Sequence, residues 1–206
     1  MKKFKRIITL LLIAVMGAVL LTSCGKTKAT PEESAKYFID MVLKNDKSNM
    51  DKIGFTEEDY SKLRTALEEN LISGFTNSGV SSNILTEDIK KGLKDNILAG
   101  FSKVEYEVGV NSTEKKVAKV EIKIKGFDVN KIAEQATVKV QDVYTEAMTQ
   151  EQIFQEQYKF IGEGFANGIL VEQPTTLTLT LNKVGSYWMT DENSSRGLME
   201  SLVASQ

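Results

Sequence analysis

The sequence predicts an α+β fold in which an antiparallel sheet of about four strands, arranged as two hairpins, packs against about five helices. Apolar residues recur at helical spacing in residues 31–100 and again in 128–165. They alternate with polar residues in 104–124 and 176–189, and a turn-forming segment divides each of these stretches. We therefore expect three helices, a hairpin, two more helices, a second hairpin and a short closing helix.

The N-terminal segment has the parts of an export signal. A basic stretch ends at Arg6, residues 7–21 form an uncharged apolar run, and small residues precede a cysteine. Leu21-Thr22-Ser23-Cys24 resembles the bacterial lipobox, whose cysteine sulfur receives a diacylglyceryl group before cleavage. We predict a signal peptide over 1–23, cleavage between Ser23 and Cys24, and lipidation of Cys24. The alternatives are an ordinary secretory signal cut nearby and an uncleaved anchor helix.

This signal predicts where the protein lies. Acyl chains such as palmitate on Cys24 would hold it at the extracytoplasmic face of the cell membrane. Residues 24–30 would be the lipidated cysteine and a short tether, and 31–206 a single extracytoplasmic α+β domain. Cleavage leaves 183 of the 206 residues, with 22 basic and 28 acidic side chains. Such an acidic chain is a poor nucleic-acid binder. The expected partners are the membrane, through Cys24, and an unidentified envelope protein or small ligand.

Helix-start signals divide the helical regions. Thr30 precedes Pro31, and Glu33 completes a capping box, so the first helix begins here and fades near Asn45. The remaining helices are expected from Thr56 to Gly74, from Thr86 to Gly100, from Asp128 to Ala147, from Thr149 to an end loosened by Gly162, Gly164 and Gly168, and from about Ser194.

The strands are expected over residues 104–110, 118–124, 176–183 and 187–189. A ligand pocket between sheet and helices would be lined by the strand residues Tyr106, Ile122 and Leu179. On the outer face, glutamates of the first strand oppose lysines of the second, the usual decoration of a solvated sheet. A strip that binds a polyanion is the alternative. The outward residues are Glu105, Glu107, Lys119, Glu121, Lys123 and Lys125.

No catalytic or metal-binding motif emerges. The chain contains no histidine, which excludes histidine-based triads and histidine metal ligands. Asp191 and Asn193 are spaced as in a calcium loop, but Leu202 stands where that loop needs glutamate, so a helix-capping turn is expected. We expect no enzyme and no cofactor, but a binding or interaction module. A small pocket-type enzyme acting on an envelope or small-molecule substrate is the alternative.

The order of elements resembles a family of Gram-positive cell-surface lipoproteins that share a domain of unknown function. The resemblance lies in residues 31–43 after the lipobox, in 104–127 leading into the next helix, and in the 176–188 hairpin. It implies an anchored extracytoplasmic domain and supplies no catalytic residues. The elements are also similar to the cystatin-like and nuclear-transport-factor-like architecture, in which a pocket often lies between sheet and helices.

Overall fold

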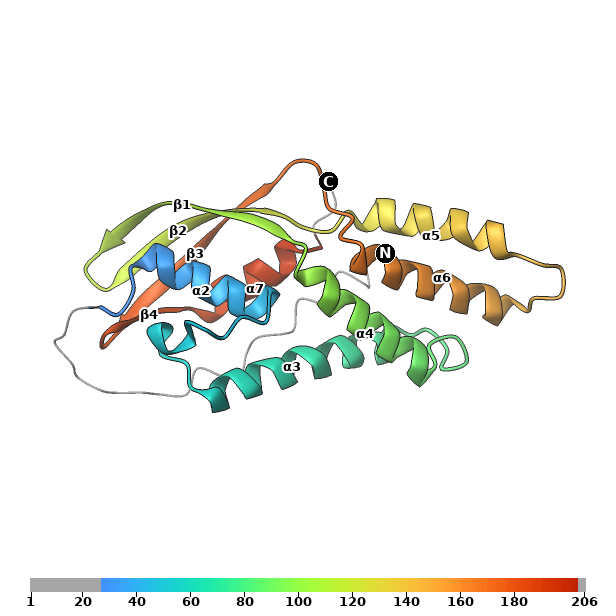
Figure 1. The fold of residues 1–206 in the computed structure, drawn as a ribbon, viewed down its shortest axis with the longest axis horizontal. Coiled ribbons are helices and arrows are strands. Elements are labelled where there is room, and N and C mark those ends of the chain that lie inside the picture. The colour runs from blue at the N-terminus through green and yellow to red at the C-terminus, as the bar shows by residue number, and fades with distance from the viewer. Residues whose placement is uncertain (1–26, 204–206) are drawn as a thin grey trace.

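The computed structural model describes residues 27–203, drawn as coloured ribbon in Figure 1. The predicted signal peptide over 1–23, the cleavage site at Ser23 and Cys24, and the first residues of the tether lie outside the described residues. The α+β prediction is confirmed: helices and one antiparallel sheet make up this part of the chain. The more specific likeness to cystatin-like proteins stays a prediction.

The two predicted hairpins form one continuous sheet. Its strands are β1 (Glu105–Glu114), β2 (Val117–Lys125), β3 (Thr175–Val184) and β4 (Tyr187–Thr190), in the order β1-β2-β3-β4. Pairing of β2 with β3, from Val117 with Asn182 to Ile124 with Thr175, joins the hairpins. Gly185, at φ +61°, begins the two-residue turn between β3 and β4, where a left-handed conformation suits glycine.

The alternation of polar and apolar residues decides which sheet face is buried. On β2, Ala118, Val120, Ile122 and Ile124 are fully buried, whereas the lysines and Glu121 between them are exposed. Glu105 lies opposite Lys125, and their side chains form an ion pair of 2.9 Å. The predicted charge pairing on the outer face is therefore confirmed. A β-bulge between Val108 and Asn111 interrupts the regular alternation that was predicted for β1.

Six α-helices and one short 3₁₀-helix lie among the described residues. They are α2 (Pro31–Leu43), the 3₁₀-helix η1 (Met50–Ile53), α3 (Glu57–Thr76), α4 (Glu87–Phe101), α5 (Val129–Val143), α6 (Gln150–Ala166) and α7 (Glu192–Ser201). The capping box predicted at Thr30 is present, and the helix expected from Thr149 also begins with one. Asp191 caps α7 by accepting a hydrogen bond from the Ser194 N–H, as expected of the turn.

Two helix ends were predicted wrongly. Helix α3 runs through Gly74 to Thr76, because the buried Gly74 does not stop it. The helix that was expected to reach Ala147 ends at Val143. Helix α6 ends at Ala166, within the stretch where glycines were expected to loosen its end, and Gly162 and Gly164 are buried inside it.

The helices form two groups, one packed with the sheet and one projecting beyond it. Helices α2 and α7 cover the buried face of the sheet at the left of Figure 1, and α3 and α4 continue the same hydrophobic core. At the right, α5 and α6 form an antiparallel hairpin, residues 129–166, that projects beyond the sheet and packs on α4. We call this hairpin the arm. An isolated bridge between Phe127 and Leu170 holds its two ends together.

Glycines let the arm approach its neighbours closely. A Cβ at Gly100 of α4 would lie 2.2 Å from the Phe165 carbonyl oxygen of α6. A Cβ at Gly164 of α6 would lie 2.8 Å from the Ile132 side chain of α5. A side chain at Gly100 would meet the backbone of α6, and one at Gly164 would meet the buried Ile132, so the arm's position is set by tight helix contacts.

The end of the expected tether lies on the sheet. The Lys28 N–H donates a 3.0 Å hydrogen bond to the Ser186 carbonyl, and the Lys28 ammonium lies 5.1 Å from the centre of the Tyr187 ring. Ala29 is buried. The described chain therefore begins at the turn between β3 and β4. None of the helices in residues 27–203 combines the length and apolar character needed to cross a membrane.

Candidate functional site

The three residues predicted to line a pocket lie on the inner side of the sheet. Ile122 and Leu179 are fully buried within the hydrophobic core. Tyr106 packs at the edge of that core and turns its hydroxyl toward α2. The hollows described below are lined by other residues, and a ligand bound at these three positions stays a prediction.

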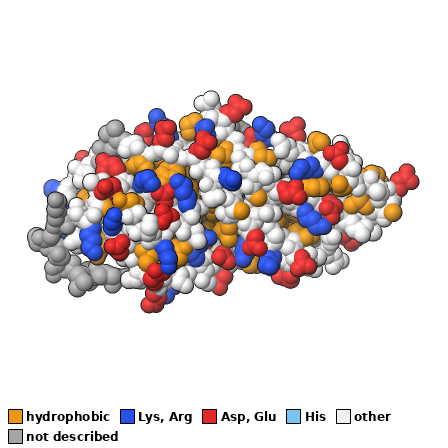
Figure 2. Space-filling model, in the orientation of Figure 1, with side chains coloured by type: hydrophobic (Ala, Val, Ile, Leu, Met, Phe, Trp, Pro, Cys, Tyr) orange, Lys and Arg blue, Asp and Glu red, His pale blue; other side chains and the backbone are white. Residues whose placement is uncertain are grey.

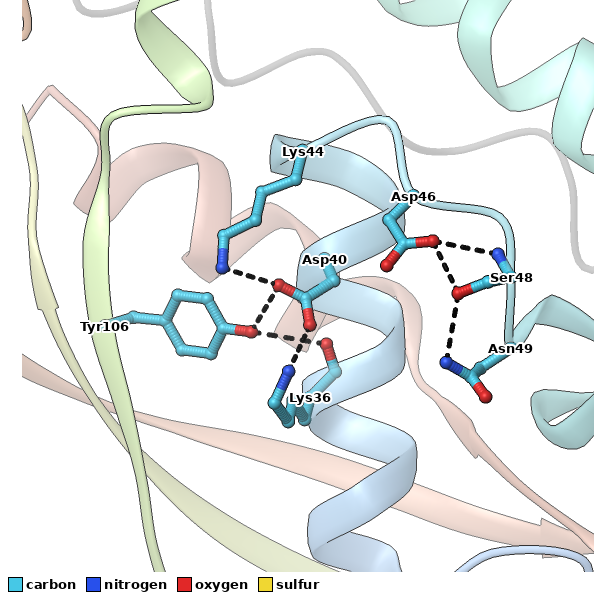
Figure 3. Close-up of polar contacts among 7 residues, drawn as sticks. All are labelled: Lys36, Asp40, Lys44, Asp46, Ser48, Asn49 and Tyr106. Carbon is cyan, nitrogen blue, oxygen red and sulfur yellow. Dashed lines mark hydrogen bonds and ion pairs between the residues drawn. The ribbon is translucent and has the colours of Figure 1, made fainter.

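Tyr106 belongs instead to a polar cluster centred on Asp40 (Figure 3). Lys36, Asp40 and Lys44 follow one another at intervals of four residues, so α2 presents them on one face. The Tyr106 hydroxyl, from β1, donates a 2.7 Å hydrogen bond to Asp40 Oδ1. The Lys44 ammonium lies 2.9 Å from the same oxygen, and Lys36 pairs with the other. Asp40 is only 6% exposed, so this carboxylate depends on these three donors.

The electrostatics of the cluster fix its protonation state. Burial favours the neutral carboxyl, but the hydrogen bonds from Lys36, Lys44 and Tyr106 outweigh burial and hold the pKa of Asp40 below its usual value. Burial, and then the hydrogen bond to Asp40, raise the pKa of the Tyr106 hydroxyl. At neutral pH the carboxylate is charged and the hydroxyl protonated. Both groups are far from the protonation changes that acid–base chemistry near pH 7 requires.

We interpret the cluster as a latch that joins α2 to β1. The Lys44 ammonium also lies 5.1 Å from the centre of the Tyr106 ring, which reinforces the same junction. Sequence reasoning missed the latch, although the four-residue spacing of Lys36, Asp40 and Lys44 is a visible signal. Its fourth member, Tyr106, comes from a strand 66 residues away from Asp40 and gave no local sign of this contact.

A second candidate site is an apolar groove between the two helices of the arm. Its volume is about 240 Å³. Phe154 is 38% exposed at this groove, so part of a large aromatic side chain is open to solvent beside it. Burial raises the pKa of Tyr158, whose hydroxyl forms no hydrogen bond with any other described residue. The groove is lined by Val129, Ile132 and Ala133 of α5 and by Phe154, Gln157, Tyr158, Ile161 and Phe165 of α6.

The size of the groove restricts what it can hold. Sites for drug-sized ligands usually occupy about 300–1,000 Å³, and a water molecule takes up about 30 Å³. The space of about 240 Å³ is therefore small for a whole metabolite but sufficient for one or two large apolar side chains. The aromatic stripe Phe154, Tyr158, Ile161 and Phe165 was expected to be core. Only Phe165 is fully buried, and the other three remain at least partly accessible.

Two larger hollows are lined mainly by polar and charged side chains. One, of about 480 Å³, lies along α3 beside Arg64, Glu68 and Glu69. The other, of about 420 Å³, lies next to the start of α5 and includes Asp128 and Glu172. Neither hollow contains an aromatic side chain other than Tyr60. The arm groove is therefore the most apolar of these three candidate binding sites.

Comparison with solved structures gives one similar fold. The putative lipoprotein YcdA from Bacillus subtilis matches with a TM-score of 0.68 and 20% sequence identity, over 84% of this chain. The chain spans 56% of the length of YcdA. At this identity the likeness concerns the fold alone. No curated protein sequence matches the chain.

A family model matches nearly the entire sequence. It is the model of the domain of unknown function DUF5105, and it covers residues 21–204. The matched region includes Cys24, both sheet hairpins and the arm. The chain belongs to the DUF5105 family of domains of unknown function.

Proposed function

We propose that this protein is a lipoprotein of a Gram-positive envelope, anchored through Cys24 at the extracytoplasmic face of the membrane. There it binds another envelope component through the arm groove and catalyses no reaction. The apolar groove beside the exposed Phe154 is the observation that carries the binding role. The lipobox-like sequence and the likeness to YcdA support the anchor.

The arm has the character of a recognition surface. Figure 2 displays hydrophobic side chains on the arm among acidic and basic ones. Val143 and Tyr144, near the far end of the arm, are 44% and 53% exposed. Aromatic side chains that are open to solvent beside a hollow are typical anchors of protein interfaces. By contrast, the latch around Asp40 holds its polar groups in fixed protonation states that suit structure rather than catalysis.

Photo-crosslinking in living cells tests this function. A photo-reactive phenylalanine derivative is placed at position 154 of the full-length protein, and in a matched strain at position 138. Val138 is also apolar and 52% exposed, but it does not line the groove. We expect a discrete crosslinked species from position 154 and none from position 138.

Mass spectrometry of the crosslinked species identifies the bound component. No adduct from position 154, or the same adducts from both positions, would contradict a binding role for the groove. Turnover of peptidoglycan fragments by the purified protein would instead support the enzyme alternative.

A further inference from the structure

The anchor and the arm lie at opposite ends of the molecule, if the chain is lipidated as proposed above. Cys24 precedes Lys28 by four residues, and an extended chain spans about 3.5 Å per residue. The lipid would therefore attach within about 14 Å of the β3–β4 turn, where Lys28 is hydrogen-bonded. In Figure 1 this turn lies at the left and the arm at the right. The arm then points away from the membrane.

The arm also carries an excess of negative charge. Residues 129–166 contain six carboxylates and three lysines, a net charge of −3. Two of the lysines are neutralised within the arm, since Lys139 pairs with Glu163 at 2.7 Å and Lys159 with Glu156 at 2.6 Å. The other four carboxylates form no ion pair with another described residue. They are Glu134, Asp142, Glu146 and Glu151.

One of these carboxylates lies beside the groove, whereas Glu134 lines the polar hollow at the start of α5. Glu151 precedes Phe154 by three residues on α6, which places both on the same side of that helix. An apolar groove is thus bordered by exposed, uncompensated negative charge.

We infer that the groove binds a basic protein segment that inserts one or two large apolar side chains. The apolar side chains would fill the groove, and lysine or arginine residues beside them would meet the carboxylates of the arm. A second copy of this chain is a poor occupant, because its arm carries the same negative charge. A bilayer of anionic lipids is equally poor, because it is negatively charged and lies at the other end of the molecule.

Three labelled peptides of equal length test the inference on the mature lipidated protein in nanodiscs of neutral phosphatidylcholine. One combines lysine with leucine, one glutamate with leucine, and one lysine with serine, and empty nanodiscs measure background. We expect the lysine–leucine peptide to bind at least about tenfold more tightly than either of the others. Phe154→Ala should weaken its binding about tenfold, and Val138→Ala should leave it unchanged.

The charges have their own test. Glu151→Gln should weaken binding of the lysine–leucine peptide about twofold at low salt and flatten its salt dependence. Equal binding of the glutamate–leucine peptide, or no effect of Phe154→Ala, would overturn the inferred chemistry. A protein adduct at position 154 would then still support the proposed function. Lipid adducts at that position would overturn the inferred occupant and the orientation of the arm away from the membrane.

Discussion

A single buried carboxylate, Asp40, links α2 to β1 by hydrogen bonds and ion pairs. Its three donors come from two turns of α2 and from β1, so the cluster is satisfied only when both elements are in place. A hydrogen bond to a charged buried group contributes about 1.5–3 kcal/mol, more than one between neutral groups. The latch therefore makes the junction of α2 with β1 specific as well as stable.

Removal of the Tyr106 hydroxyl tests the latch. We expect Tyr106→Phe to lower the free energy of unfolding by about 1.5–3 kcal/mol at pH 7, because Asp40 loses a donor while it remains buried. Urea denaturation measures the change. Tyr144→Phe is the control, since Tyr144 is 53% exposed, and its effect should be within about 0.5 kcal/mol.

The latch also predicts a pH dependence. The folded-state pKa of Asp40 lies below its unfolded value of about 3.9. Its charged form therefore stabilises the fold above that pH, and this contribution is lost as the pH falls through the folded-state pKa. We expect the stability difference between wild type and Tyr106→Phe to shrink below about pH 4. A constant difference from pH 7 to pH 3 would contradict this electrostatic account.

At the scale of elements, glycines govern how helices α4, α5 and α6 pack together. Gly100 and Gly164 allow two helix contacts in which a Cβ would meet a neighbouring backbone or side chain below 3.0 Å. Gly162 also faces α4, where a Cβ would lie 2.8 Å from the side-chain Nδ2 of Asn96, which can move more easily than backbone. The groove of the arm depends on this packing, since α5 and α6 each supply one of its walls.

Adding a methyl group at one of these contacts should be costly. We expect Gly100→Ala to lower the free energy of unfolding by about 1–3 kcal/mol, because α4 and α6 must separate. Gly92→Ala is the matched control in the same helix, where a Cβ meets nothing within 4 Å. The control should raise stability by up to about 1 kcal/mol, since alanine favours helix over glycine. Equal effects in urea denaturation would refute the packing role.

The type and order of these elements were predictable because their signals are local. Capping boxes, periodicity and turn residues each act within a few positions, as at Thr30, Thr149 and Gly185. The error at Gly74 arose because glycine has the same local signature whether it ends a helix or lies buried inside one. Likewise, the exposure of Phe154 depends on the spacing between α5 and α6, which no local pattern reveals.

At the scale of the whole molecule, a lipid on Cys24 would set the orientation of the domain relative to the membrane. The lipid would hold the β3–β4 end near the bilayer, and α5 and α6 would carry the groove to the far end. Anchored as proposed, the protein would present the groove away from the membrane.

Loss of the thiol should release the protein from this orientation. We expect Cys24→Ser to carry no acyl chain, because serine cannot form the thioether to the lipid donor. Intact mass spectrometry of the N-terminal peptide distinguishes the two proteins. Wild type should have lost residues 1–23 and gained the mass of its lipid. An unmodified Cys24 in protein purified from membranes would contradict lipidation and favour an uncleaved anchor.

The arm lies between β2 and β3 in the sequence, which affects how fast these two strands can pair during folding. The two strands are neighbours in the sheet, yet 49 residues, 126–174, separate them along the chain. Closing a flexible loop of that length costs roughly 3 kcal/mol in its length-dependent term. Helices α5 and α6 are joined by a short connection and pack against each other, so the arm can form before β2 pairs with β3. Formation of the arm would bring Phe127 toward Leu170. The folded arm would then shorten the effective loop between β2 and β3. Substitutions that destabilise the arm would slow the pairing of these strands, although the arm makes few contacts with the sheet.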